Sequence, residues 1–166
     1  LNDPRIRENF IVIVFSFYRL QALFKHNFSL GALVKFHTQQ KFLLLAHSRK
    51  HYDTLGQLVA KPKSMGLEIL KVKYGEIFMD ALTFKATPKK NTDVLLHMMG
   101  FLKKILSKEE KKDILSVIED YRKQLLPLIV PVTLIRHHVN KHKIEYLMGQ
   151  AYLNPHPKEL MLRNHV

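Results

Sequence analysis

The chain has 166 residues, enough to bury about two-thirds of its unfolded surface in one core without disulfides or metals. It contains no cysteine, which excludes thiolate metal ligands, a thiol nucleophile and an iron–sulfur cluster held by this chain itself. Lys and Arg number 27 against 14 Asp and Glu, and the resulting charge of +13 indicates an anionic partner. Nucleic acid is the first candidate and an acidic membrane surface the second.

The first predicted helix begins at Pro4, after an Asx cap at residues 2–3. Apolar residues off its main stripe indicate either deeper burial or contact with another domain, and both remain open. The longest apolar run, 10–15, is far too short to cross a bilayer, and no signal peptide opens the chain, so we expect a cytoplasmic protein. The first residue is Leu, so we expect a longer native chain. The predicted core stripe recurs at three and four residues: Ile6, Phe10, Ile13, Phe17, Leu20 and Phe24.

The stretch 30–56 breaks the apolar pattern of its own helix. At about 100° per residue, His37 and Lys41 fall on the stripe where hydrocarbon is expected, and such breaks concentrate at functional sites. Taken singly, His37 predicts a hydrogen-bonded core histidine and Lys41 a lysine whose ammonium reaches water. Together with His47 and the basic turn after Ser48, which caps the helix 48–60, they indicate a polar floor that receives an anionic ligand.

Five further helical segments follow, and no strand alternation or internal repeat is present. We expect helices over 67–84 and over 92–106, the second of them after an Asn91 cap. A capping box at 107–110 begins the next helix, and another helix runs to about Lys141. The last helix covers 144–152, and one or two turns follow up to Arg163. The predicted fold is all-α, an irregular single-domain bundle of about seven to eight helices over 1–166. Its predicted buried residues include Phe101, Ile105 and Leu125, and Gly100 predicts a close backbone approach.

Ten histidines make metal binding the first chemistry to consider. His47 and His51 have the i, i+4 spacing of a ligand pair, but no Glu stands between them as in a zincin helix, and they straddle a cap. The neighbours His137 and His138 point to different sides of a helix. We therefore expect no metal ligands and no cofactor in this chain. A small metal- or histidine-dependent hydrolase remains an alternative, built on His37, His47, His51 and His97.

Basic residues mixed with histidine and tyrosine favour RNA binding. Lysine and arginine neutralise phosphates, and the planes of His, Tyr and Arg stack on unpaired bases. A single lysine is most simply a solvated helix residue, but the excess over the whole chain exceeds what solubility requires. The candidate RNA-binding residues are His37, Lys41, His47, Arg49, Lys50, His51, His97, Lys103, Lys104, Arg136, His137, His138, Lys141 and Arg163.

Phe36-His37-Thr38 with Lys41, followed by Leu45-Ala46-His47-Ser48 and His51-Tyr52, resembles the signature of the YbgA-type domain of unknown function. The likeness continues through 91–104, 119–122, 127–131 and 152–165, and so covers nearly the whole chain.

The opening residues 1–10, with 1–5 as the junction, resemble the point at which this domain follows a TudS-type, iron–sulfur thiouracil desulfidase domain. Such a fusion implies a non-catalytic module that binds tRNA and presents 4-thiouridine to the desulfidase, whose cluster belongs to the missing domain. The resemblance implies no catalytic residue here. A protein–protein docking domain is a further alternative.

Overall fold

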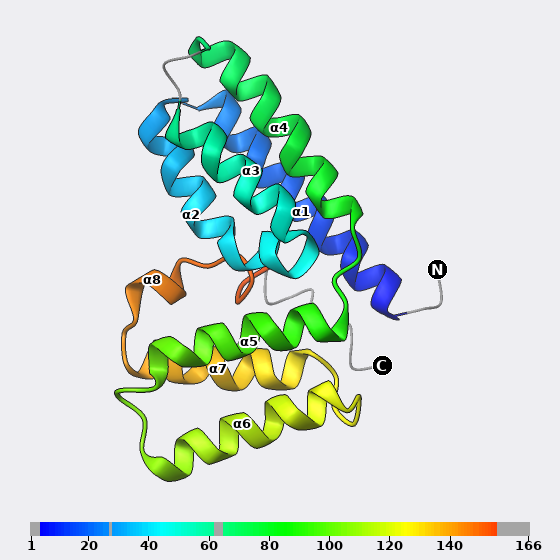
Figure 1. Cartoon of the computed structure of the whole chain (residues 1–166), viewed down its shortest axis with the longest axis vertical. Helices are drawn as coiled ribbons and strands as arrows, with labels where there is room; N and C mark the ends of the chain where they lie inside the picture. The colour runs from blue at the N-terminus through cyan, green and yellow to red at the C-terminus, as the bar shows by residue number, and fades with distance from the viewer. Residues whose placement is uncertain (1–3, 27, 62–64, 156–166) are drawn as a thin grey trace.

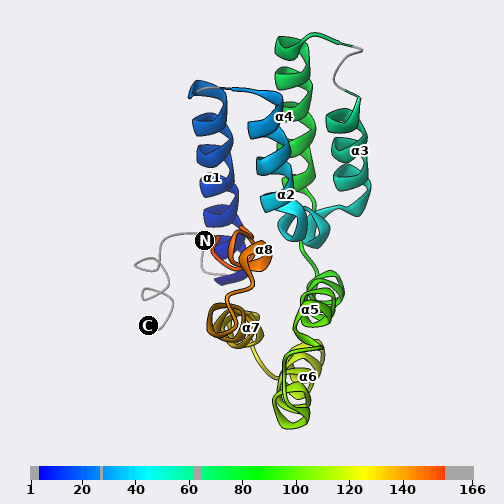
Figure 2. The same ribbon diagram turned by 90° about the vertical axis from the view of Figure 1, so that its left-hand side faces the viewer.

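Two layers of helices make up the structure. The computed structural model describes residues 4–26, 28–61 and 65–155, and within these ranges it contains eight helices and no strand, which confirms the predicted all-α fold. Helices α1 to α4 stand side by side, α5 to α7 lie across their lower end, and α8 lies between the layers (Figures 1 and 2). The helices are α1 (Pro4–Lys25), α2 (Leu30–His47), α3 (Arg49–Ala60), α4 (Leu67–Thr83), α5 (Pro88–Leu102), α6 (Lys108–Arg122), α7 (Ile129–Lys141) and α8 (Glu145–Met148).

Helix α2 is the centre of the core. It contacts α1, α3, α4 and, in the other layer, α5. Its second half, residues 40–47, is buried or half-buried on every side, as in a helix that neighbours cover all round, whereas Val34, Lys35 and Thr38 of its first half are exposed. None of the described helices is both long and apolar enough to cross a membrane. The buried apolar residues of α2 are Leu33, Phe36, Phe42, Leu43, Leu44 and Ala46.

Side-chain caps define the helix starts. The Ser48 hydroxyl caps α3, and Ser107 forms the predicted capping box with Glu110, whose carboxylate accepts the Ser107 N–H at 2.9 Å. The predicted Asn91 cap is wrong, because Thr87 caps α5 and Pro88 occupies its first turn, where proline needs no N–H. Asn91 is instead buried and accepts a hydrogen bond from the Tyr152 hydroxyl at 2.9 Å.

Helix α1 buries only part of the predicted stripe: Ile13, Leu20 and Phe24 pack in or against the core. Phe10 and Phe17 are exposed, whereas Ser16 and Leu20 are fully buried. Only α2 and α4 pack on α1 among its principal contacts, and α1 lies at the edge of its layer (Figure 2), so one narrow side is covered. The side chain of Ile6 and the cap at residues 2–3 lie outside the described residues.

Other predicted core positions lie near helix ends. Phe101 and Ile105 are exposed at the end of α5, and Leu125 is 69% exposed. Helix α6 ends at Arg122 because Gln124 adopts a positive φ of 61° that turns the chain, and Leu125 follows this turn. Helix α8 stops at Met148 rather than 152. The close approach expected at Gly100 is absent, since no described atom lies within 4 Å of a Cβ placed there.

The segment after α8 ties the layers together. Gln150 donates to the Thr38 carbonyl at 3.0 Å, and the Ala151 N–H donates to the Gln39 carbonyl at 2.9 Å. Arg19 of α1 donates to the Asn154 carbonyl at 2.6 Å, and Arg136 of α7 donates to the Leu153 carbonyl at 3.3 Å. Arg136, a candidate RNA contact, is therefore half-buried in an intramolecular role.

Candidate nucleic-acid interface

Two of the predicted site histidines are core residues. Nδ1 of His37 lies 3.1 Å from the Tyr74 hydroxyl, and its ring stacks on Tyr52 with 5.1 Å between centroids. The Nδ1–H of His47 donates to the Phe84 carbonyl at 2.7 Å. Burial lowers the pKa of both histidines, so each imidazole is neutral at pH 7. The predicted polar floor therefore does not form an open binding surface around these two histidines, because both side chains are buried.

His51 is committed to neighbours through both ring nitrogens. Its Nε2–H donates to Asp80 at 2.9 Å, and its Nδ1 lies 2.6 Å from the Ser48 hydroxyl. Three of the four ring nitrogens of His47 and His51 therefore lie within hydrogen-bond distance of other groups. Lys90 of α5 donates to the carbonyl of His47, the last residue of α2, at 2.6 Å, and this hydrogen bond joins the two helices.

The remaining candidates divide between intramolecular contacts and open surface. His138 is buried, and Lys141 forms a 2.9 Å ion pair with Glu110, whereas His137 is exposed. Arg163 lies outside the described residues. Three of the candidate lysines are exposed and have no ion pair within the part of the chain that the structure describes: Lys50, Lys103 and Lys104.

Three aromatic rings from two helices form a row on the surface, here called the aromatic platform: His97, Phe101 and Tyr146. The rings of His97 and Phe101 stack with centroids 5.9 Å apart, and those of Phe101 and Tyr146 with centroids 5.3 Å apart. The buried ring of Phe42 meets all three at steep angles of 84°, 84° and 72°. Phe101 is 40% and Tyr146 37% exposed, so solvent reaches both rings, while the Phe42 ring that they pack on is fully buried.

Cations border the aromatic platform. The Lys41 ammonium lies 5.3 Å from the centroid of the Phe42 ring, which contacts all three rings of the platform. Burial, followed by repulsion from Lys41 and Arg49, lowers the pKa of His97, so its ring is uncharged at neutral pH and available for stacking. Lys104 is exposed in the turn that follows α5. Lys41, Arg49 and His97 are the predicted candidates that the fold gathers.

Phe101 and Tyr146 are the members that sequence reasoning missed. Phe101 fits the apolar stripe of α5 by its spacing from Val94 and Met98, which predicts a core position. Its i, i+4 relation to His97 was the available signal. Tyr146 lies on α8, far along the chain, and only the packing of α8 against α2 and α5 brings it to Phe101.

Comparison with known proteins gives a family without an established activity. Residues 41–157 match the family described as "Protein of unknown function (DUF1722)". The chain is 28% identical over 165 residues to "Uncharacterized protein YbgA" of Escherichia coli (strain K12), covering 99% of this chain and 98% of that protein. No solved structure matches the chain.

Proposed function

The chain belongs to the DUF1722 family of proteins of unknown function, and we propose that this YbgA-like member binds structured RNA, tRNA above all, without catalysing a reaction itself. The exposed aromatic platform with Lys41 and Arg49 beside it carries this proposal. Proteins that read unpaired nucleotides combine aromatic stacking surfaces with cations that follow the phosphates. The charge of +13 supplies the long-range attraction that a polyanion requires.

The RNA is proposed to be substrate for a TudS-type 4-thiouridine desulfidase domain, whose iron–sulfur cluster this cysteine-free chain does not hold. Such a domain would pack on α1, where Phe10, Val14, Phe17 and Tyr18 are exposed on one helix. The match to YbgA covers 98% of that protein, which leaves little room there for a fused domain. RNA binding is therefore proposed as a property of this module alone.

A tRNA titration at about 50 and about 200 mM salt tests RNA binding. Each phosphate neutralised contributes roughly 0.7 to 0.9 to the slope of log affinity against log salt. Replacing Lys41, Arg49 and Lys50 by Ala is expected to reduce both affinity and slope. The control replaces three exposed lysines elsewhere by Ala: Lys73, Lys108 and Lys112. An equal loss in both variants would show that net charge, not this surface, drives binding, and no binding by the unmodified chain would exclude the function.

A second candidate function, a histidine-dependent hydrolase, is favoured by a chain of hydrogen bonds. A carboxylate only accepts, so Nε2–H of His51 donates to Asp80, and with the single ring proton on Nε2 the Nδ1 atom accepts from the Ser48 hydroxyl. This polarity, serine to histidine to carboxylate, is that of an activated nucleophile. The other histidines named for a hydrolase, His37, His47 and His97, lie in separate environments.

A serine-reactive fluorophosphonate separates this candidate from RNA binding. Covalent labelling detected by intact mass, and lost in Ser48→Asp, would support a nucleophilic Ser48. Aspartate also caps helices, so this variant removes the hydroxyl while keeping the start of α3. The absence of labelling in the unmodified chain would leave Ser48 with its capping role alone.

A further inference from the structure

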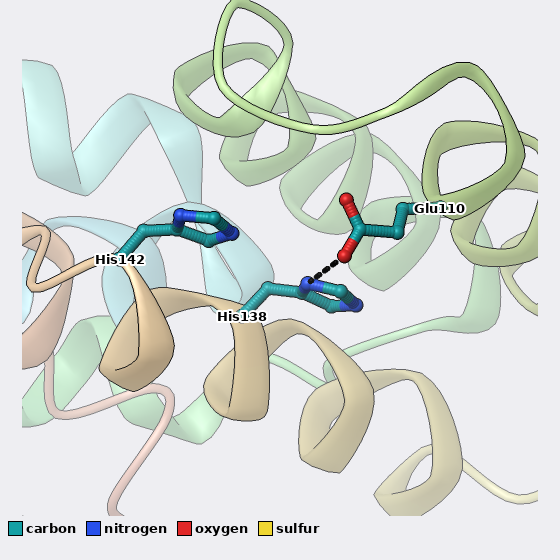
Figure 3. A group of neighbouring side chains, drawn as sticks. All are labelled: Glu110, His138 and His142. Carbon is teal, nitrogen blue, oxygen red and sulfur yellow. Dashed lines mark ion pairs between the residues drawn. The ribbon is translucent and has the colours of Figure 1, made fainter.

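Side chains from α6 and α7 converge at a place outside the aromatic platform. One ligand atom each from Glu110, His138 and His142 lies within 4.8 Å of the other two (Figure 3). His138 Nδ1 faces the Glu110 carboxylate at 3.9 Å, and the rings of His138 and His142 stack nearly parallel with 6.2 Å between centroids. The two histidines are four residues apart, a spacing that places both imidazoles on one side of a helix.

Two imidazole nitrogens in this cluster lack hydrogen-bond partners. Nδ1 of His138 and Nε2 of His142 are buried, and neither has a partner among the residues that the structure describes. The side chain of His138 is 7% exposed overall. Buried polar atoms normally have hydrogen-bond partners, so these two nitrogens beside one carboxylate favour a ligand that all three groups bind.

Local structure holds the three side chains in place. Glu110 occupies the N3 position of α6, where its Oε2 accepts the Ser107 N–H. His142 is the C-cap of α7, and Lys143 follows it with a positive φ of 52° that lets the chain turn back over the helix end. The backbone N–H of Ile144 then reaches the Val139 carbonyl at 3.1 Å.

We propose that Glu110, His138 and His142 bind a divalent metal ion of the zinc class. Two imidazole nitrogens and one carboxylate oxygen suit Zn²⁺, which binds such atoms at about 2.0 to 2.2 Å. Tetrahedral bonds of that length place ligand atoms roughly 3.3 Å apart, so the ligand atoms, now within 4.8 Å of one another, need to approach by at most about 1.5 Å. Three protein ligands leave the fourth position open for water or an anionic ligand, as in catalytic zinc sites.

Lys141 competes with the metal in this arrangement. Its ammonium lies 2.9 Å from Oε1 of Glu110, the oxygen that faces His138. The metal must displace this ammonium, and its positive charge also opposes a cation nearby. Removing Lys141 is therefore expected to increase zinc affinity, an effect that a purely structural ion pair does not produce.

Titration of the metal-free full chain with Zn²⁺, followed by calorimetry, tests the site. One equivalent is expected to bind, and His142→Ala is expected to weaken binding by 10-fold or more. Glu110→Gln keeps the capping acceptor and is expected to weaken binding by a similar factor. Lys141→Met is expected to tighten binding at least several-fold. The control, His137→Ala, removes the exposed neighbouring imidazole and is expected to leave the affinity within about two-fold of the unmodified chain.

Each remaining outcome overturns the proposal. Failure of both the unmodified chain and Lys141→Met to bind zinc stoichiometrically would assign Glu110 to its cap and its ion pair alone. Equal losses in His137→Ala and His142→Ala would place the metal elsewhere on the histidine-rich surface. Thermal unfolding without metal, measured for every variant, shows which variants remain folded, and Glu110→Gln and Lys141→Met keep the test decisive if His142→Ala unfolds.

Discussion

Nδ1 of His37 lies 3.1 Å from the hydroxyl of Tyr74, and both side chains are buried. The contact joins α2 to α4, and the stacked ring of Tyr52 adds α3 to the same junction. Burial raises the pKa of Tyr74 far above its ordinary value, so its hydroxyl stays protonated across the physiological range. An imidazole that interrupts an apolar helix stripe thus serves as an internal hydrogen-bonding group at the meeting point of three helices.

We expect Tyr74→Phe to lower the free energy of unfolding by about 1 to 3 kcal/mol, because the buried Nδ1 of His37 loses its partner. Urea denaturation measures the change. The control is Tyr18→Phe, which removes a hydroxyl from an exposed side chain of α1 and is expected to change stability by less than about 0.5 kcal/mol. Equal stability of Tyr74→Phe and the unmodified chain would mean that His37 finds another partner.

Acid is expected to destabilise the fold as the pH falls below about 6.5. Burial lowers the pKa of His37, His47 and His138 in the folded chain. Below the ordinary histidine pKa the unfolded chain therefore binds protons that the folded chain does not, and this stability is lost as pH falls toward the folded pKa values. Denaturation at several pH values between about 7.5 and about 5.5 measures the slope.

The matched variants for this slope are His47→Gln and His26→Gln. Glutamine still has an N–H for the Phe84 carbonyl but does not titrate, so His47→Gln is expected to flatten the decline. His26 is exposed, and its replacement is expected to leave the slope unchanged. A stability that does not vary with pH over this range would contradict the role given to the buried imidazoles.

The helix caps could be predicted from the sequence because they depend on residues close together in the chain. The Ser48 cap and the Ser107–Glu110 capping box depend on residues three apart, and the structure confirms both. The face of α1 that is buried, the exposure of Phe101 and its contact with Tyr146 depend on which helices happen to cover each side. Spacing alone carries no such information, because a stripe of apolar residues does not state how much of it a neighbour reaches.

The proposed metal site also combines a part that local spacing shows with a part that only packing brings in. The i, i+4 spacing of His138 and His142 is visible in the sequence alone. Glu110 belongs to another helix, so its place beside that pair required the packing of α6 on α7.

Gln124→Gly is expected to raise the free energy of unfolding by about 0.5 to 1 kcal/mol. Gln124 follows the C-cap of α6 with φ at 61°, a conformation that costs a residue with Cβ but not glycine. The turn already has the bonds that favour it, since the Leu125 N–H reaches the Asp120 carbonyl at 2.9 Å. The control is Lys112→Gly inside α6, which is expected to lower stability by about 1 kcal/mol. A loss of stability in Gln124→Gly, measured by urea denaturation, would contradict the assignment of this turn.

Truncating the aromatic platform is expected to weaken RNA binding without changing its salt dependence. Stacking of one base contributes about 1 to 3 kcal/mol, so Phe101→Ala or Tyr146→Ala should reduce tRNA affinity by roughly 5- to 150-fold at fixed salt. The slope against salt should stay the same, because neither ring neutralises a phosphate or releases a counterion. Variants of Lys41 and Arg49 should change that slope, so the two classes of contact are separable in one set of titrations.

Two control variants accompany the platform variants. Tyr146→Phe keeps the ring and is expected to keep most of the affinity, whereas Tyr18→Ala removes an exposed aromatic ring of α1 and is expected to leave affinity unchanged. If Tyr18→Ala weakens binding as much as Phe101→Ala does, the loss reflects exposed aromatic surface in general. If Phe101→Ala binds like the unmodified chain while the Lys41 variant does not, the cations bind the backbone alone and the stacked rings only support the junction of α5 and α8.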